Sequence, residues 1–351
     1  MKIALLNNLY EPFNRGGAEK VVSLLAQDFI NQGHEVFIIT TRPINATEPK
    51  IDSLKVYYLP SRYYDLNRLS KMARFFWQVG NVFDLVQTKK VKAILKKEKP
   101  DLISTHNLMG LSFLTPRLIR CLKIRQEHYL HDIQLLHPSG LMFYGQEKKI
   151  DSLSAKFYQL FTRCFFASPV KVISPSEWLM EQYKQRGFFR RSELEVRPFK
   201  LAPEQKIVNQ PARTSGRHFL YVGQMEDHKG IFLLINAFKK LPDKQAKLIM
   251  VGDGTKLSRA KEQASTDQRI SFWGKYQGQE LEKLMAQSDY LVIPSLCYEN
   301  SPTTILEAHA CGVPVIAARI GGIPEITNRD DKLFEPGNET DLLNKLQSQP
   351  S

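Results

Sequence analysis

The chain has 351 residues, of which 42% are hydrophobic and 24% are charged, so about two globular domains are expected. The formal net charge is +13, from 49 basic and 36 acidic residues. Such an excess suits nucleic acid, an anionic membrane or phosphorylated substrates. No recognisable nucleic-acid reading motif accompanies it, which argues against nucleic acid.

Composition also bears on the compartment. The cysteines show no C-x-x-C spacing, which argues against zinc and for reduced thiols: Cys121, Cys164, Cys297 and Cys311. Residues 1–8 resemble a short strand rather than a signal peptide, because the apolar run is brief and no small-residue cleavage site follows. The apolar stretch 157–173 is interrupted by Arg163 and Lys171 and is too short to span a membrane. We therefore expect a cytosolic protein.

Short β-rich runs alternate with helical patterns along the chain, which predicts βαβ units and parallel sheets. The strands expected in the first half are Lys2–Asn7, Val36–Thr40, Lys55–Leu59, Leu102–Thr105, Arg125–Leu130 and Lys171–Ile173. Those expected in the second half are Phe219–Val222, Lys247–Val251, Ile270–Phe272, Tyr290–Ile293 and Val315–Ala317. Helices are expected at Glu19–Ile30, at Ser176–Arg186 and near Thr340–Gln347.

One break in this pattern predicts two doubly wound, Rossmann-like α/β domains. Residues 201–216 are polar, contain proline and glycine and have no strong period. They are expected to link an N-terminal domain, 1–200, to a C-terminal domain, 217–351. Ligands of such folds bind at the carboxyl ends of the strands, so a cleft between the two domains is the expected site.

Two motifs of the first domain follow predicted strands. Gly16 and Gly17 open a helix, where glycine lets the backbone approach a ligand closely, although a tight turn also needs glycine. His131 and Asp132 follow a later strand, where an imidazole can hydrogen-bond a sugar or orient an acceptor. Asp132 can fix the tautomer of His131 or can bind a ligand separately. The spacing of the neighbouring histidines does not suit a metal.

Basic residues concentrate between Arg68 and Lys99 and alternate with apolar ones, including Phe75, Phe76 and Trp77. One interpretation is a helix lying on an anionic lipid surface. The other is a core helix followed by a solvated, lysine-rich helix. The periodicity is compatible with both.

Two glycine-containing turns follow strands of the second domain. The segment from Gly223 to Gly230 carries Lys229, which can neutralise a diphosphate leaving group without a metal. An exposed lysine beside a turn glycine is the alternative. The sequence from Gly252 to Gly254 begins like a dinucleotide fingerprint, but Leu257 occupies the place of its third glycine. It is expected to be a strand-ending turn on the nucleotide side of the site.

Two carboxylates, Glu299 and Glu307, flank a predicted helix start. Ser301 is expected to be the N-cap and Pro302 the first helical residue, so free N–H groups and the positive end of the helix dipole can hold a phosphate. Glu307 then lies about two turns into the helix, where a carboxylate can bind a ribose diol, while Glu299 binds a second polyol. The plainer interpretation is that one of these two glutamates is exposed on the helix surface and the other caps a nearby group.

In order and spacing, these motifs resemble the retaining GT-B glycosyltransferases of family 4 over nearly the whole chain. The segments that carry the resemblance are Gly16–Glu19, His131–Asp132, Ile173–Trp178, Gly223–Gly230, Gly252–Gly254, Glu299–Glu307, and Gly312–Ile316 with Gly321–Glu325. The resemblance implies transfer of a sugar from a nucleotide-diphosphate sugar to a glycan or lipid-linked acceptor, in surface polysaccharide or glycolipid synthesis. It further implies retention of anomeric configuration without metal or cofactor. The donor base (UDP, GDP or ADP), the sugar and the acceptor stay open.

The resemblance also implies residue roles. Glu307 would bind the donor ribose and Glu299 the hydroxyls of the transferred sugar. Lys229 would counter the diphosphate charge, and His131 would sit beside the reacting sugar. The other implied donor-binding positions are Gly16, Gly17, Gly223, Gln224, Gly252, Asn300, Ser301, Thr303 and Thr304.

The chain departs from the family pattern in two ways. Gln224 stands where the family usually has Arg, and the chain stops at Ser351, where relatives commonly carry a further helix. Both departures support one alternative, a non-catalytic, membrane-attached binding protein. Two enzymatic alternatives also stay open: a sugar-nucleotide epimerase of the same fold, and a glycan phosphorylase, which would need pyridoxal phosphate on a lysine that no segment clearly indicates.

Overall fold

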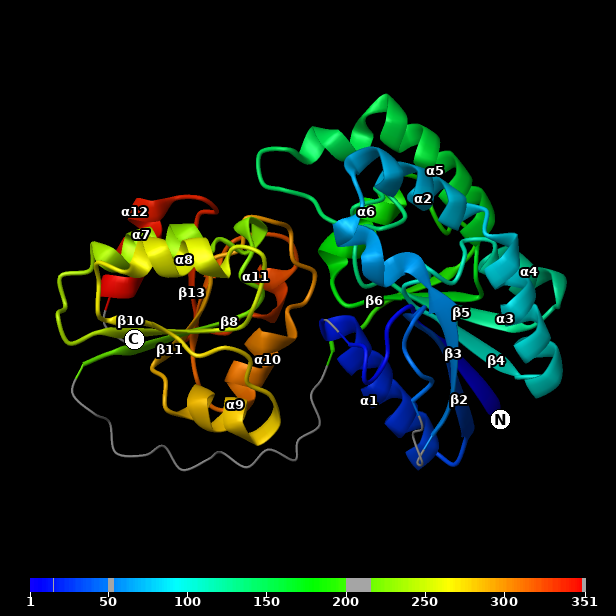
Figure 1. Ribbon diagram of the computed structural model, residues 1–351, viewed down its shortest axis with the longest axis horizontal. Helices are drawn as coiled ribbons and strands as arrows, with labels where there is room; N and C mark the ends of the chain where they lie inside the picture. Colours follow the sequence, from blue (N-terminus) through cyan, green and yellow to red (C-terminus); the bar gives the residue numbers. More distant parts are fainter. Residues whose placement is uncertain (15, 50–53, 200–215, 349–351) are drawn as a thin grey trace. The chain divides into compact units, whose positions relative to one another are not determined.

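The computed structural model describes residues 1–14, 16–49, 54–199 and 216–348. They form two compact units (Figure 1), one comprising Met1–Gly140 with Lys148–Arg197 and the other Leu141–Glu147 with the chain from Pro198 onward. Apart from Gly216, the predicted linker 201–216 lies outside the described residues, and the predicted domain boundaries stay predictions.

The first unit contains a seven-stranded parallel sheet of order β3-β2-β1-β4-β5-β6-β7. Its strands are β1 (Lys2–Leu6), β2 (Glu35–Pro43), β3 (Lys55–Ser61), β4 (Leu102–Thr105), β5 (Arg125–Tyr129), β6 (Lys171–Ser174) and β7 (Glu193–Val196). Its α-helices are α1 (Gly17–Asn31), α2 (Lys71–Val82), α3 (Leu85–Glu98), α4 (Thr115–Cys121), α5 (Leu153–Phe166) and α6 (Glu177–Gln185). The 3-10 helices are η1 (Arg62–Arg68) and η2 (Glu147–Asp151).

Burial explains why the central strand of this sheet is apolar. In β1, Ile3, Leu5 and Leu6 are fully buried, as expected for a strand covered on both faces. Serine or aspartate begins most of the longer helices, because its side chain accepts a hydrogen bond from a free N–H group of the first turn. The N-caps of α2, α3, α5 and α6 are Ser70, Asp84, Ser152 and Ser176.

The second unit contains a six-stranded parallel sheet of order β10-β9-β8-β11-β12-β13. Its strands are β8 (His218–Val222), β9 (Lys247–Val251), β10 (Ile270–Phe272), β11 (Tyr290–Ile293), β12 (Val315–Ala318) and β13 (Lys332–Phe334). Its helices are η3 (Asp227–Lys229), α7 (Ile231–Lys239), α8 (Leu257–Ala264), α9 (Gly278–Ala286), α10 (Thr303–Ala310), α11 (Ile323–Ile326) and α12 (Glu339–Gln347).

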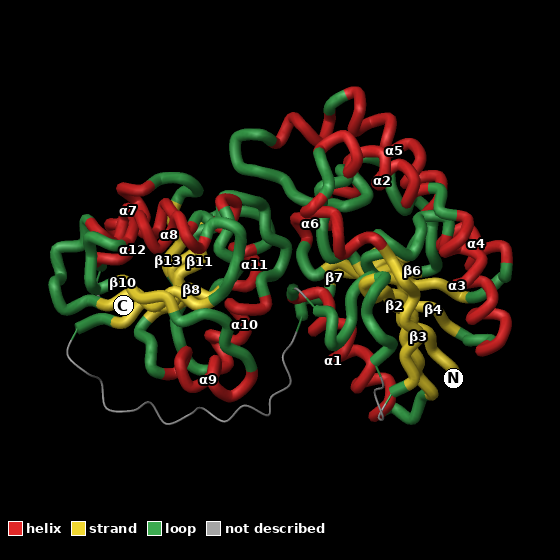
Figure 2. Tube along the Cα trace, in the orientation of Figure 1, coloured by secondary structure: helices red, strands yellow, loops and turns green. Residues whose placement is uncertain are grey.

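Helices cover both faces of the second sheet (Figure 2). α7, α8 and α12 pack together on one face, and α9 and α10 pack together on the other. The core between them includes Phe219, Phe238 and Tyr290, each at most 2% exposed. In both sheets the strand order reverses once, between β1 and β4 and between β8 and β11. Ligands of doubly wound folds bind at the carboxyl ends of the strands at such reversals.

All the predicted strands are confirmed, and most end within two residues of the expected position, although β2 continues to Pro43. The strands β7 and β13 were not predicted. Both lie at sheet edges, and the sequence Glu-Leu-Glu-Val of β7 lacks the apolar run of a central strand. The expected doubly wound α/β class is confirmed in both units.

Candidate donor-sugar site

Lys229 and Glu299 meet at the strand-order reversal of the second sheet. Lys229 ends the short helix η3 after β8, and Glu299 follows β11. The Nζ atom of Lys229 lies 2.6 Å from Oε1 of Glu299, and Ser295 Oγ donates to the same oxygen at 2.9 Å. The structure therefore brings two of the predicted site residues into direct contact, although they are 70 positions apart in the chain.

The pair stays charged despite its burial. Burial alone would raise the pKa of Glu299, but the ammonium of Lys229 outweighs it and the pKa is lowered. Burial likewise opposes the charge of Lys229, and the Glu299 carboxylate outweighs it, so the pKa of Lys229 is raised. The thiol of Cys297 lies 3.8 Å from the same carboxylate oxygen, and burial together with that negative charge raises its pKa to about 12.

Two close backbone approaches fix the loop that carries Glu299. The backbone of Gly321 has a φ of 62°, and a Cβ there would lie 2.1 Å from the carbonyl oxygen of Glu299. The next N–H group, of Gly322, donates to that oxygen at 2.8 Å. At Gly230 a Cβ would lie 1.8 Å from the carbonyl oxygen of Pro294. Only glycine permits these approaches, so the glycines after β8 and β12 lock the Glu299 loop in place.

The predicted strand-ending turn after β9 is confirmed. Gly252 has a φ of 140°, and a Cβ on it would lie 1.9 Å from the carbonyl oxygen of Gly223. The side chain of Gln224 is exposed, while its carbonyl oxygen accepts a hydrogen bond from Tyr221 Oη at 2.7 Å. Donor binding by Gly223, Gln224 and Gly252 stays a prediction.

The prediction of the α10 N-terminus is wrong by one residue. Pro302 has an extended ψ of 116° and occupies the N-cap, so the helix begins at Thr303 and Ser301 makes no capping bond. Ser301 Oγ is shielded from solvent and has no hydrogen-bond partner within the described ranges. Glu307 lies one turn beyond Thr303 and is half-buried. The other half-buried residues at this helix start are Asn300, Ser301, Thr303 and Thr304.

A segment from the middle of the chain, Leu141–Glu147, packs onto the strand-end loop that carries Glu299. The N–H group of Tyr144 donates to the carbonyl oxygen of Leu296 at 2.9 Å, and the N–H group of Tyr298 donates to that of Met142 at 2.8 Å. These two bonds form an antiparallel bridge between Phe143 and Cys297. We call residues 141–147 the 141–147 segment.

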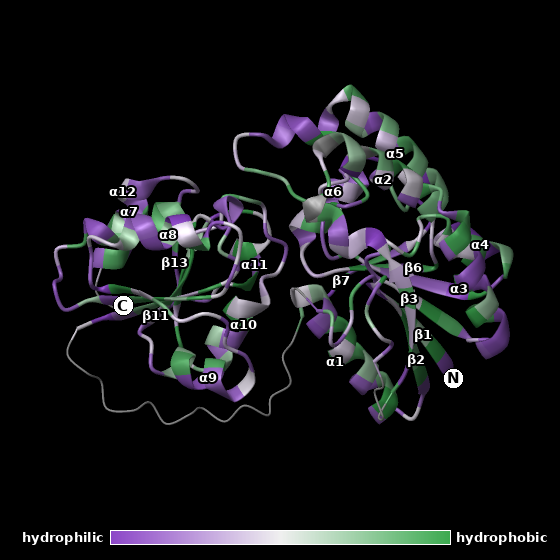
Figure 3. Cartoon of the chain, viewed as in Figure 1, coloured by the Kyte–Doolittle hydropathy of each residue, from purple (hydrophilic) through white to green (hydrophobic). Residues whose placement is uncertain are grey.

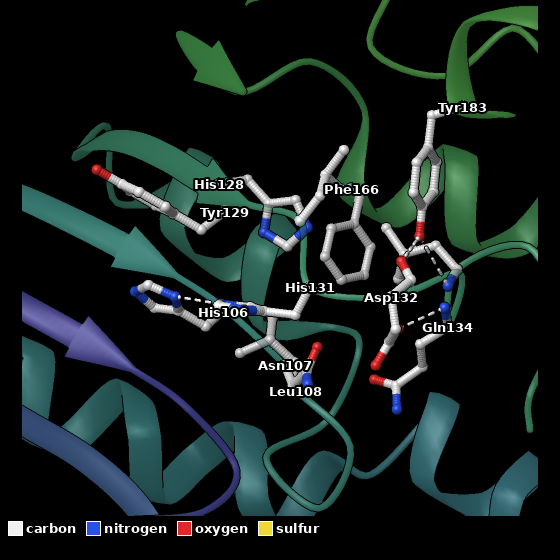
Figure 4. A pocket seen from close by; sticks show the side chains of 12 residues that line it. His106, Asn107, Leu108, His128, Tyr129, His131, Asp132, Gln134, Phe166 and Tyr183 are labelled. Atoms are coloured by element: carbon white, nitrogen blue, oxygen red, sulfur yellow. Dashed lines mark hydrogen bonds between the residues drawn. The ribbon is translucent and has the colours of Figure 1, made fainter. Parts of the chain in front are cut away.

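In the first unit, His131 and Asp132 line a pocket at the end of β5 (Figure 4). His131 Nε2 lies 2.8 Å from Nδ1 of His106, which follows β4. The Asp132 carboxylate accepts from the N–H group of Gln134 at 2.7 Å, and its carbonyl oxygen accepts from Tyr183 Oη at 2.8 Å. The hydrogen bond to His106, which the sequence did not predict, is thus a means of fixing the tautomer of His131.

Burial sets the protonation of this pocket. It lowers the pKa of His131 to about 4 and that of His106 well below the usual value of histidine. It raises the pKa of Asp132 to about 6. Both imidazoles are therefore neutral at pH 7, and each carries a single N–H proton.

Gly16 and Gly17 begin α1, as predicted, although the helix starts two residues earlier than expected. The carboxylate of Glu19 accepts a hydrogen bond from the Gly16 N–H group at 3.1 Å. Because the Gly16 N–H group already donates to the Glu19 carboxylate, it is less available to bind a phosphate of the sugar donor than the sequence suggests.

Sequence reasoning missed Ser295 and His106, which contact Glu299 and His131. Each follows a strand that was predicted, so the rule that ligands meet the carboxyl ends of parallel strands could have identified both. Within the described residues, no cluster of three or more His, Cys, Asp or Glu side chains is placed to hold a metal ion. No helix among them has both the length and the apolarity to cross a bilayer.

The architecture is that of known glycosyltransferases. HepE from Anabaena, in a crystal structure with UDP-glucose, has a TM-score of 0.71 and 18% identity, covering 99% of this chain and 88% of its own. The lipopolysaccharide outer core galactosyltransferase WaaB, in its apo form, has a TM-score of 0.67 and 19% identity, covering 99% of this chain and 89% of its own. The two parallel-sheet units thus have the GT-B fold.

Sequence comparison identifies the family. Residues 15–198 match Glycosyltransferase Family 4, and residues 216–348 match Glycosyl transferases group 1. The chain belongs to glycosyltransferase family 4. Its relatives include an uncharacterized 42.6 kDa protein in the cps region of Klebsiella pneumoniae, 25% identical over 93% of this chain and 87% of the relative. N-acetyl-alpha-D-glucosaminyl L-malate synthase of Bacillus anthracis is 24% identical over 94% of this chain and 83% of the relative.

Proposed function

We propose that this glycosyltransferase transfers a sugar from a nucleoside-diphosphate sugar to a glycan or lipid-linked acceptor, with retention of configuration and without a metal. The observation that carries the proposal is the partly buried ion pair of Lys229 and Glu299 at the strand-order reversal of the second sheet. An ammonium there can neutralise a departing diphosphate, and a carboxylate beside it can accept hydrogen bonds from sugar hydroxyls.

In the proposed reaction the acceptor hydroxyl attacks the anomeric carbon on the face from which the diphosphate departs. The bond between the anomeric carbon and the phosphate oxygen breaks, the bond to the acceptor oxygen forms, and the acceptor proton passes to the departing phosphate. Lys229 stabilises the charge that develops on that phosphate, while Glu299 and Glu307 hold the sugar and the ribose. His131 contributes from the first unit as a partner of the reacting sugar.

The names of the relatives support a choice of substrates to test. The HepE structure contains UDP-glucose, which makes UDP-sugars the first donors to try. WaaB is a lipopolysaccharide galactosyltransferase, which favours a lipid-linked saccharide acceptor in surface polysaccharide or glycolipid synthesis. The Bacillus anthracis relative is named as a synthase of N-acetyl-alpha-D-glucosaminyl L-malate, so small hydroxy acids such as malate belong in the same panel.

The test is donor turnover by the wild type and by Glu299→Gln, which keeps the size of the side chain and removes its charge. We expect release of the nucleoside diphosphate from one UDP-, GDP- or ADP-sugar, and a loss of about a hundredfold or more in the variant, typical of preorganised electrostatic groups. Glu280→Gln, at an exposed position of α9, is the matched control.

Equal turnover by Glu299→Gln and wild type would refute the site. Conversion of the donor to an isomeric sugar nucleotide without an acceptor would identify an epimerase instead. Calorimetry showing donor binding without turnover over the whole panel would identify a binding protein, in keeping with Gln224 at the position usual for Arg.

We also propose that the first unit rests on the anionic inner face of the cell membrane. Stretches of α2 and α5 carry the green of hydrophobic residues in Figure 3. The exposed apolar side chains lie about one helical turn apart on each helix: Met72, Phe76 and Val79 on α2, and Leu153, Phe157 and Leu160 on α5. Phe83, at the end of α2, contacts Phe161 of α5 with ring centroids 5.7 Å apart. An apolar face beside the exposed lysines of α3 suits an anionic lipid surface. Co-sedimentation with vesicles tests it.

A further inference from the structure

A chain of three polar side chains runs from the interior of the first sheet to the pocket. Ser104 on β4 is fully buried, and its Oγ lies 3.1 Å from Nε2 of His106. The other ring nitrogen of His106, Nδ1, lies 2.8 Å from Nε2 of His131, which lines the pocket (Figure 4). The spacing of all three groups is that of hydrogen bonds.

The Ser104 hydroxyl determines the direction of these bonds. Within the described part of the chain, His106 is its sole hydrogen-bond partner. A buried hydroxyl whose proton finds no acceptor is costly, so Ser104 donates to His106 Nε2. A neutral imidazole has one donor and one acceptor nitrogen, so His106 carries its proton on Nδ1. That proton is donated to His131 Nε2, and the remaining proton of a neutral His131 must be on Nδ1.

The ring of His106 is also held in orientation. It stacks on Tyr129 with ring centroids 5.0 Å apart and an interplanar angle of 21°. The Oη atom of Tyr129 in turn lies 3.4 Å from a guanidinium nitrogen of Arg197. A half-turn flip of the His106 ring would place carbon atoms where its two nitrogens now lie, and would therefore break both hydrogen bonds.

We propose that Ser104 and His106 are positioning residues that hold His131 in the tautomer protonated at Nδ1. His131 then acts as a neutral hydrogen-bond donor and has no free basic nitrogen with which to remove a proton. The chemical class of its partner, a sugar hydroxyl or a phosphate oxygen, rests on the proposed function; the tautomer itself does not.

Histidine NMR tests the tautomer directly. We would label the full chain with ¹⁵N-histidine, record two-bond ¹H–¹⁵N spectra at pH 7, and assign His131 by its loss in His131→Asn. The expected wild-type spectrum shows His131 protonated at Nδ1. Ser104→Ala should reduce that population, and His106→Asp, which offers only an acceptor, should move the proton of His131 to Nε2. His106→Asn keeps an N–H donor near the position of Nδ1 and should preserve the wild-type tautomer.

Turnover gives a second readout. Turnover is measured with the sugar donor and acceptor identified by the test of the proposed function. His106→Asp should lower kcat by roughly tenfold to a hundredfold with a smaller change in KM, because the variant loses a hydrogen bond that His131 donates in the transition state. His106→Asn should retain kcat within about threefold, on the same reasoning. Thr105→Val is the matched control, since it removes a buried hydroxyl one residue away that contacts His128 at 3.0 Å.

Three results would overturn the inference: a wild-type His131 protonated at Nε2, an unchanged tautomer in both Ser104→Ala and His106→Asp, or an equal loss of kcat in Thr105→Val. If the NMR results are as expected and no donor is consumed by the wild type, the tautomer relay stands and the proposed function fails. The two claims are therefore separable.

Discussion

The contact between Lys229 and Glu299 has a direct implication for donor binding. Without a donor, the ammonium is neutralised by the carboxylate that is expected to hold the sugar. Under the proposed function, a diphosphate that enters would have to share or replace this contact, so part of the donor affinity would offset the loss of the pair. In return, neither charge is left unpaired where it is shielded from water, and an unpaired charge there would be costly.

Replacing Lys229 by Met should therefore have two effects. Loss of the cation should lower kcat/KM by roughly tenfold to a thousandfold, as for other preorganised electrostatic groups. The stranded carboxylate should also lower the free energy of unfolding by about 1 to 3 kcal/mol. Steady-state kinetics and urea unfolding measure the two separately.

The double variant Lys229→Met/Glu299→Gln separates charge burial from catalysis. It should recover much of the lost stability, because no unpaired charge remains, and should stay inactive. Lys256→Met removes a lysine whose ion pair with Asp227 is largely solvated, and should change neither quantity appreciably. Wild-type kcat/KM in Lys229→Met would exclude Lys229 from the diphosphate site.

Part of this residue-level picture was predictable from the sequence. Glu299, Lys229 and His131 follow predicted strands, and the rule for parallel sheets places such residues at the binding edge. Their partners were not predicted, because Ser295 and His106 acquire their roles only through the fold. The expected N-cap at Ser301 was wrong, because both Ser301 and Pro302 are typical of helix starts and the sequence does not decide between them.

Among the elements, helix α3 is linked to the first sheet through the buried carboxylate of Glu98. Glu98, at the end of α3, is 4% exposed and lies 2.8 Å from Lys2 Nζ of β1 and 2.7 Å from Lys55 Nζ of β3. It also accepts a hydrogen bond from the hydroxyl of Tyr57. The lysines and the tyrosine hydroxyl lower the pKa of Glu98 to about 2. One side chain thus links a helix to two strands.

The lowered pKa predicts how stability depends on pH. The ordinary pKa of Glu is about 4.5, so above that pH the carboxylate is ionised in the folded and unfolded states and its full contribution is present. As the pH falls from about 4.5 to about 2, the unfolded state takes up the proton first and the contribution is lost. Glu98→Gln should therefore be less stable than wild type at pH 7, and the difference should shrink towards pH 3.

Urea unfolding of the wild type and Glu98→Gln at both pH values measures this. Glu35→Gln is the control, because Glu35 also pairs with Lys2 but is 65% exposed, and exposed pairs contribute little. A stability difference that stays constant from pH 7 to pH 3 would show that the carboxylate is not held by these partners.

The sequence predicted elements best where burial is complete. Central strands such as β1, β9 and β11 are continuous apolar runs and were located within one residue. The edge strands β7 and β13 escaped prediction, because β7 has no buried residue and β13 has only Phe334, and their sequences are correspondingly mixed. The sequence did not decide the role of residues 68–99, because a helix that faces lipid and a helix that faces a protein core show the same spacing of apolar residues.

For the whole molecule, the exposed faces of α2 and α5 predict binding to anionic vesicles. The wild type should co-sediment with vesicles that contain phosphatidylglycerol and less with pure phosphatidylcholine, and high salt should weaken binding by screening the lysines of α3. Phe76→Ser/Phe157→Ser should reduce binding, because these rings are 64% and 65% exposed and would enter the lipid. The side chains of Arg68, Lys71 and Phe75 lie outside the described residues.

Trp273→Ser alters an aromatic residue of the second unit that is 45% exposed, and it should leave vesicle binding unchanged. No sedimentation of the wild type at low salt would refute the membrane proposal. Self-association without vesicles that is abolished by Phe76→Ser/Phe157→Ser would refute it as well, since the apolar face would then be covered by a second copy.

The path of the chain makes the second unit discontinuous. Leu141–Glu147 belongs to it, whereas the residues on either side belong to the first unit, so the polypeptide passes between the units three times. A proteolytic or genetic cut within 200–215 would consequently leave a C-terminal fragment whose Tyr298 amide has lost its acceptor on Met142. Such halves are natural candidates for fragment complementation: each should be incomplete when expressed alone, and mixing should restore the missing strand contact without any covalent connection.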